Sequence, residues 1–468
     1  MVFNIIPLKI RKMKQIIYLF VLAIIATSCD DWMDIQPKGK VIPSKAEDYR
    51  LLLDATQDIG ESAITVTGDL DLWVTDDIDL RDDFIGASYS EYQSKAFMYE
   101  DHFYLESEED EGMQKMYAVN YICNAVISEV LEADGDEAEK QKLYAEAKVH
   151  RAFTFLKLVN MYAKQYEPAT AATDLGVPMH LEPLLEGSLK RGTVNDVYDL
   201  IINDVTEVYD YLPETPEQLW QPSQSSASAL LARTYLIMGD FNNALKYADM
   251  SLDKKSYLTD YNTLPGHSWY PTLLDFGPRY LNEEQLLRKK PTSDYRMIYP
   301  SQEFMDLFDQ TNDLRFTGKI TFEWSLPGTG LVYYYGYNSG SPYGLTVPEM
   351  LLTRAECYAR TGEHALAMDD INLLRQNRIA TAAYVPLTAA SADEALSIVK
   401  DERRRELAFM GHRYTDIRRY NAYDNANISI VHTVNGDTYA LAPGDNKWAL
   451  PFARKYIGKN PEIEQNPR

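Results

Sequence analysis

The chain has 468 residues, 45% of them hydrophobic, which is enough for a large core in one domain or in two closely packed domains. Its formal net charge of −24 opposes long-range attraction to polyanions, so nucleic acid is a poor candidate partner. Neutral glycans and peptides remain open as ligands.

Residues 1–28 have the pattern of a lipoprotein export signal. Basic residues precede the apolar run 16–25, which is about half as long as a membrane span. Small residues then lead into Cys29, where we expect lipid attachment that tethers the protein to a membrane without spanning it. Acids follow the cysteine, as in surface-export signals of bacterial lipoproteins. The alternatives are a plain secretory signal and a start at Met13 in place of Met1.

An irregular, loop-rich segment is expected over about 55–110, and it holds a cluster of acids between residues 69 and 83. The cluster lacks the order of an EF-hand loop, which needs Gly at its sixth position and Glu at its twelfth. We therefore expect a solvated acidic loop here, with a Ca²⁺ site as the alternative.

Most of the remaining chain is predicted to be helical. Segment 193–212 has apolar residues at i, i+3, i+4 and i+7, an N-terminal capping box of Thr193 and Asp196, and Pro213 as a stop. Similar patterns cover 113–131, 137–164, 225–238, 241–253, 348–361, 363–378 and 393–410.

Two of these helix pairs share the spacing A-x2-Y-x3-G-x4-A. The spacing begins at Ala232 in one pair and at Ala355 in the other, and its glycines are Gly239 and Gly362. This is the pattern of tetratricopeptide repeats, with small residues where two helices touch and glycine at the turn between them. We predict a mostly α fold in which tetratricopeptide-like helix pairs form a scaffold. The predicted domain spans 29–468, with the scaffold at about 113–253 and 347–420.

The segment between the two repeats has a different composition. From Tyr257 to Tyr343 it holds 18 aromatic residues, and Pro and Gly interrupt it repeatedly. The run 331–337 favours a strand. We predict a loop-rich insertion with a few short strands over about 255–346.

Two cysteines besides Cys29 lie within predicted helices, at Cys123 and Cys357. No two cysteines are close enough in sequence for a C-x-x-C metal or redox motif. We expect buried thiols, with a disulfide as the alternative, because sequence cannot supply the distance that a disulfide needs.

The C-terminal third carries a family resemblance. Its motifs are LTRAECYARTG at 352–362, AMDDINLLRQNR at 367–378 and DERRRELAFMGHRYTDIRR at 401–419, with Leu-Pro and Asn-Pro pairs after them. Together they closely resemble the SusD/RagB family of Bacteroidetes lipoproteins, and the resemblance covers essentially the whole mature chain. One departure is Met410, where the family usually has an acid.

The resemblance implies four tetratricopeptide-like helix pairs and a loop-rich half that bears the ligand site. It also implies a lipid-anchored protein on the outer face of the outer membrane. A SusC-like TonB-dependent transporter would be its partner, covered by the protein like a lid. Relatives bind oligosaccharides, and some bind peptides.

The motif at 401–419 also has a physical interpretation of its own. Opposite charges at helical spacing pair with one another, so an ion-pair network that holds the last helices is the expected role, and ligand binding is the alternative. The charged residues are Arg403, Arg404, Arg405, Arg413, Arg418 and Arg419, interleaved with Asp401, Glu402, Glu406 and Asp416.

The sequence contains no nucleophile elbow, H-E-x-x-H, P-loop or dinucleotide-binding motif. No pair of acids is singled out for glycoside hydrolysis. We therefore expect a protein without enzyme activity, metal or cofactor, and a secreted hydrolase is the weakest alternative.

The sequence supports a binding function better than an enzymatic one. The apolar faces of sugar rings stack on flat aromatic side chains, while polar groups at the rim of a site bind the hydroxyls. The candidate stacking residues are Trp73, Tyr104, Trp269, Tyr270 and Trp324. The predicted function is capture of an oligosaccharide for the transporter. The alternatives are a peptide-binding member of the same family and a protein-assembly scaffold without a small-ligand site.

Overall fold

The computed structural model describes residues 43–54, 56–58, 61–80, 90–184, 187–268, 273–277, 282–292, 297–322, 331–334 and 343–468. Residues Lys45–Arg468 form one compact unit. Its helices are α2 (Ala46–Leu53), α3 (Glu91–Phe97), α4 (Glu111–Glu129), α5 (Glu137–Tyr162), α6 (Val194–Val208), α7 (Gln224–Met238), α8 (Phe241–Lys254), α9 (Gln302–Met305), α10 (Leu314–Lys319), α11 (Val347–Arg360), α12 (His364–Gln376), α13 (Ala392–Glu406), α14 (Arg413–Asp424) and α15 (Arg454–Lys459).

The strands are short. They are β1 (Thr56–Asp58), β2 (Glu61–Ser62), β3 (Val66–Thr67), β4 (Leu175–Pro178), β5 (Arg191–Thr193), β6 (Gln285–Leu287), β7 (Lys290–Pro291), β8 (Met297–Ile298), β9 (Ile320–Phe322), β10 (Leu331–Tyr334), β11 (Leu345–Thr346), β12 (Ile430–Val434) and β13 (Asp437–Leu441). One three-stranded sheet has the order β8-β10-β9, and its central strand lies in the aromatic run where a strand was predicted. The predicted fold class, mostly α with a few short strands, is confirmed.

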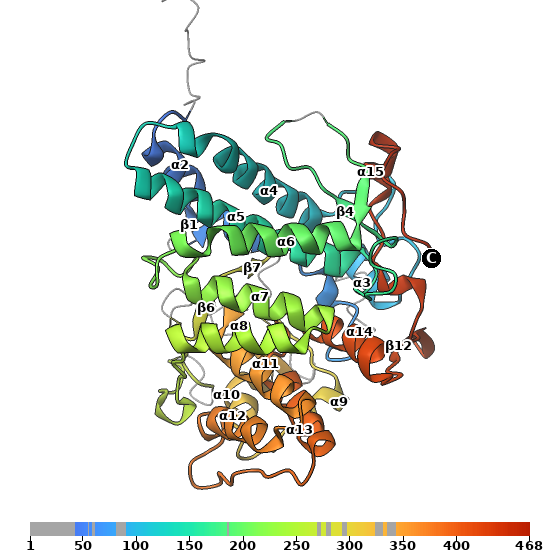
Figure 1. The fold of residues 1–468 in the computed structure, drawn as a ribbon. Helices are drawn as coiled ribbons and strands as arrows, with labels where there is room; N and C mark the ends of the chain where they lie inside the picture. Colours follow the sequence, from blue (N-terminus) through green and yellow to red (C-terminus); the bar gives the residue numbers. More distant parts are fainter. Residues whose placement is uncertain are drawn as a thin grey trace, which may run out of the picture. The chain divides into compact units, whose positions relative to one another are not determined.

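The long helices follow one another as a stack. In Figure 1, α5, α6, α7, α8 and α11 lie side by side in this order, from the blue-green part of the chain to the orange part. Helix α11 packs directly against α8, although the insertion 255–346 separates the two in sequence. The two predicted repeats, α7–α8 and α11–α12, are therefore neighbours in space.

The predicted turn glycines have the backbone conformation that the repeat requires. Gly239 and Gly362 have φ angles of +77° and +90°, in the left-handed region that side chains other than Gly seldom adopt. A Cβ atom on Gly239 would also lie 2.9 Å from the ring of Tyr423. A larger residue at 239 would therefore require the ring of Tyr423 to move.

Two helices end four residues earlier than their patterns predicted. Helix α6 begins at its predicted capping box, where Thr193 Oγ1 accepts a hydrogen bond from the N–H of Asp196 at 3.1 Å, but it ends at Val208 and continues as a 3₁₀ turn. Helix α13 ends at Glu406 and not at residue 410, because the chain enters the left-handed region soon afterwards, at Phe409 (φ +59°). Terminal residues are the part of a helix that periodicity defines least well.

The core is centred on α5, which is buried over most of its length from Leu143 to Tyr162. Cys123 and Cys357 are free and buried, so the prediction of two buried thiols is confirmed and the alternative of a disulfide between them is wrong. Burial raises the pKa of the Cys123 thiol to about 12, which keeps it protonated. Over the part of the chain that the structure describes, no helix combines the length and the hydropathy needed to cross a membrane.

Candidate functional site

The structure describes two of the five predicted stacking residues, and both are buried. Trp73 and Tyr104 are 4% and 5% exposed, and the ring of Tyr104 stacks on Tyr92 with ring centroids 5.4 Å apart. Trp269, Tyr270 and Trp324 lie outside the described residues. Neither Trp73 nor Tyr104 exposes a ring face to solvent, so a ligand could contact them only if these side chains moved.

Over its described part, residues 69–80, the acidic segment is largely buried and Asp79 is its one exposed acid, so the expectation of a solvated loop is wrong there. Asp69, Asp71 and Asp77 are at most 4% exposed. The Nζ atom of Lys157, from α5, lies 2.5 Å from an oxygen of Asp71. Sequence could not show this, because the basic partners of the segment come from α5, α13 and α14, far along the chain.

Burial and neighbouring arginines shift the pKa values of the carboxylates in this segment. Burial favours protonation of Asp76, but Arg413 donates two hydrogen bonds to its oxygens, at 2.8 and 2.6 Å, and holds the pKa of Asp76 below its usual value. Burial raises the pKa of Asp77 to about 6. The described residues, including 69–80 of this segment, contain no group of three or more His, Cys, Asp or Glu side chains placed to hold a metal ion.

Five of the six arginines of the 401–419 motif form ion pairs, as predicted, whereas Arg418 donates to backbone carbonyls. Asp416 accepts from both Arg403 and Arg419, each at 2.9 Å, and Glu402 accepts from Arg405. Most of the other partners lie outside the motif, however, and these partners could not be predicted from helical spacing. Arg404 pairs with Asp77 at 2.7 Å, an interaction that spans more than 300 residues of sequence.

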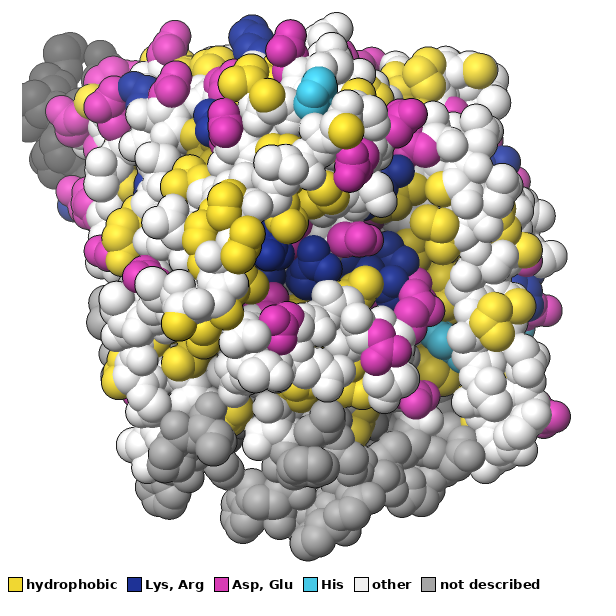
Figure 2. Space-filling view, turned by 90° about the horizontal axis from the view of Figure 1, so that it is seen from below, with side chains coloured by type: hydrophobic (Ala, Val, Ile, Leu, Met, Phe, Trp, Pro, Cys, Tyr) yellow, Lys and Arg dark blue, Asp and Glu magenta, His cyan; other side chains and the backbone are white. Residues whose placement is uncertain are grey.

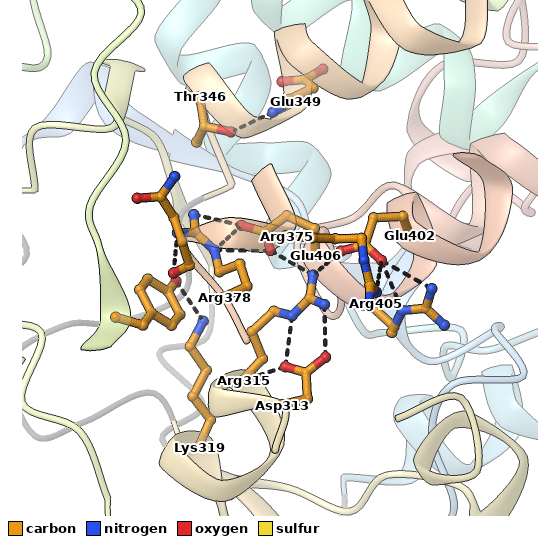
Figure 3. A network of polar contacts seen from close by, with 12 residues as sticks. Asp313, Arg315, Lys319, Thr346, Glu349, Arg375, Arg378, Glu402, Arg405 and Glu406 are labelled. Atoms are coloured by element: carbon orange, nitrogen blue, oxygen red, sulfur yellow. Dashed lines mark hydrogen bonds and ion pairs between the residues drawn. The ribbon is translucent and has the colours of Figure 1, made fainter. Parts of the chain in front are cut away.

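Figure 3 shows the centre of this network, in which Arg315 lies between three carboxylates. Its nitrogens lie 2.7 Å from Asp313, 2.6 Å from Glu402 and 2.9 Å from Glu406. Arg378 joins the same cluster through Glu406, at 2.9 Å. Arg315, Arg378 and Glu402 are at most 2% exposed. Burial favours the protonated acid, but the guanidiniums of Arg315 and Arg405 hold the pKa of Glu402 well below its ordinary range.

The network therefore holds α10, α12 and α13 together and offers no free charge to a ligand. On the face seen in Figure 2, Lys and Arg side chains gather in a hollow and Asp and Glu side chains lie at its edge. A basic patch with its own acids is a poor site for a polyanion.

A polar hollow of about 360 Å³ lies between the end of α5, α14 and the loop after β13. We call it the polar cleft. It is lined by Lys164, Gln165, Glu167, Thr170, Asp174, Arg418, Asn421, Ala422, Pro443, Gly444, Asp445, Asn446, Trp448 and Ala449. Sequence reasoning placed Arg418 in the ion-pair network and did not single out the other residues.

Two buried polar atoms in the polar cleft have no partner among the described residues. Arg418 donates to the carbonyl of Ala163 at 2.7 Å through Nη2, which leaves its Nε–H unpartnered. Gln165 donates to the carbonyl of Ile237 at 2.7 Å, which leaves its Oε1 unpartnered. One donor and one acceptor beside the indole of Trp448 could bind a neutral hydroxylated ligand.

Lys289 is a buried lysine whose pKa is lowered, a property that catalytic amines share. Lys289 Nζ lies 2.9 Å from His150 Nδ1 and donates to the carbonyl of Ile64 at 2.7 Å. Burial lowers the pKa of Lys289 to about 7. Its side chain is only 1% exposed, so a substrate does not reach it in this structure.

Comparison with known proteins relates the chain to one family. Residues 40–236 match a family model described as "Starch-binding associating with outer membrane", and residues 347–468 match one described as "SusD family". SusD-like protein P2 of Formosa agariphila is 24% identical over 373 residues, which is 66% of this chain and 72% of that protein.

Solved structures share the fold. A putative sugar binding protein from Bacteroides vulgatus matches with a TM-score of 0.68 at 20% identity, over 92% of this chain and 99% of the other. A SusD-like carbohydrate binding protein from the same species matches with a TM-score of 0.62 at 18% identity, over 90% of this chain and 97% of the other.

Proposed function

The chain belongs to the SusD family, and from this premise we propose that it captures an oligosaccharide at the cell surface and passes it to a SusC-like TonB-dependent transporter. The observation that carries the proposal is the match of two SusD models to the two helical parts of the chain, residues 40–236 and 347–468. Two structural relatives are described as sugar binding and carbohydrate binding proteins, which supports the ligand class.

The proposed role involves no chemistry on the ligand. The buried acids of the acidic segment and of the 401–419 motif are engaged by arginine and lysine, which favours a structural role for them. A lipid on Cys29 would hold the protein at the outer membrane, in keeping with the outer-membrane association that the name of the first family model states.

We further propose that Trp269, Tyr270 and Trp324 stack on the sugar rings. Their place in the aromatic insertion supports this role, and the burial of Trp73 and Tyr104 leaves these three as the stronger candidates. The polar cleft is the competing location, since it offers hydrogen bonds through Gln165 and Arg418.

Replacing Trp269 and Trp324 together with Ala is expected to weaken glycan binding about 10- to 100-fold. Each ring–ligand contact of this kind contributes on the order of 0.5–1.5 kcal/mol beyond its buried area, and a factor of ten in affinity is about 1.4 kcal/mol. Titration calorimetry with the bound glycan measures the loss. Tyr211→Ala removes an aromatic side chain that is 50% exposed on the helical scaffold, and it should leave affinity unchanged.

Gln165→Leu separates the two locations. Native affinity in this variant, together with weak binding in the double tryptophan variant, supports the insertion as the site. The opposite pattern would move the site to the polar cleft, and unchanged affinity in both variants would contradict both assignments.

A further inference from the structure

A second hollow, of about 290 Å³, lies between α4, the segment after β4 and the C-terminal residues around α15. We call it the apolar pocket. Its walls are mostly carbon, from residues such as Met113, Tyr117, Pro178, Leu189, Phe452 and Ile463. Among the described residues, it shares none with the polar cleft, and neither Trp73 nor Tyr104 lines it.

Most polar groups around the apolar pocket are already engaged within the protein. The hydroxyl of Tyr117 donates to the carbonyl of Pro178, and that of Tyr456 donates to the carbonyl of Asp110, both at 2.9 Å. A ring nitrogen of His180 lies 2.7 Å from the carbonyl oxygen of Leu184. The two tyrosines therefore offer the pocket their rings and not their hydroxyls.

Asn120 is different. Its side chain lines the pocket, is 1% exposed, and has no hydrogen-bond partner for either Oδ1 or Nδ2 among the described residues. Asn124 lies one helical turn further along α4 and lines the same pocket, but both polar atoms of its side chain are hydrogen-bonded. Its Nδ2 donates to the carbonyl of His180 at 3.0 Å, and its Oδ1 accepts from Arg151 at 2.9 Å. A buried amide without a partner costs free energy, so its presence at Asn120 calls for a ligand group.

We propose that the apolar pocket binds a neutral ligand with one aromatic ring and one carboxamide, whose N–H and C=O pair with the Oδ1 and Nδ2 of Asn120. The volume of the pocket, about 290 Å³, is sufficient for such a ligand, because an apolar cavity of about 150 Å³ is enough to hold benzene. A free sugar does not fit, because its hydroxyls would lie against carbon with a single amide to bind them. This site is therefore distinct from the proposed glycan site and does not depend on it.

Benzamide is the probe that tests the proposal, on the soluble chain 30–468. Ligand-observed NMR should show saturable binding of benzamide, with weaker binding of methyl benzoate, which lacks the N–H donor, and none of glucose. Asn120→Leu should weaken benzamide binding at least tenfold. Leu189→Trp, at the partly exposed wall of the pocket, should block binding by filling it.

Thermal unfolding supplies the control. Asn120→Leu should leave Tm unchanged or higher, because it removes an unpaired amide, whereas Asn124→Leu should lower Tm because it breaks two hydrogen bonds. Failure of benzamide to saturate, equal binding in native, Asn120→Leu and Leu189→Trp chains, or a Tm loss in Asn120→Leu as large as that in Asn124→Leu would each overturn the proposal.

Discussion

Glu402→Gln is expected to lower the free energy of unfolding by about 3–5 kcal/mol, the range seen when one partner of a buried ion pair is removed. The change would leave the guanidinium of Arg315, 2% exposed, with one fewer carboxylate, and it would also weaken the pairs with Arg375 and Arg405. Denaturant unfolding followed by circular dichroism measures the difference.

The matched control is Glu106→Gln. Glu106 is 83% exposed at its side chain and lies 3.4 Å from Arg454, so its removal should cost less than about 1 kcal/mol. Equal stabilities of the native and Glu402→Gln chains would mean that the buried network does not hold the last helices.

Cys29→Ser is expected to move nearly all of the protein from the membrane fraction to the soluble fraction, because the cysteine sulfur is the proposed point of lipid attachment. A lipid chain contributes about 0.8 kcal/mol for each buried CH2 group. Cell fractionation with metabolic fatty-acid labelling follows both the position and the lipid.

Cys123→Ala keeps Cys29 and should remain membrane-bound and labelled, since Cys123 is buried within the fold. Retention of label in Cys29→Ser would show that the lipid is attached elsewhere.

The parts of the fold that sequence predicted are those fixed by local pattern. The helix pairs around Gly239 and Gly362 follow from periodicity and from glycine at a left-handed turn, both of which act within a few residues. The end of α13 was missed because the apolar residues 407–410 continue the helical pattern in the sequence, whereas the backbone of Phe409 has left the helical region.

The candidate site was predicted less well, because its residues are brought together by long-range contacts. Asp77 appeared to belong to a solvated loop, yet it pairs with Arg404 more than 300 residues away. Arg418 appeared to be one more member of an ion-pair network, yet it donates to carbonyls at the end of α5 and lines the polar cleft. Local charge patterns cannot distinguish these environments.

The central claim is that the chain captures an oligosaccharide without altering it. A glycan array probed with the soluble chain 30–468, with a peptide library beside it, tests this most directly, and chromatography of the bound glycan tests for cleavage. The account predicts saturable binding to one class of neutral glycan, which is recovered intact. Binding to peptides alone, or recovery of shortened glycan, would contradict it.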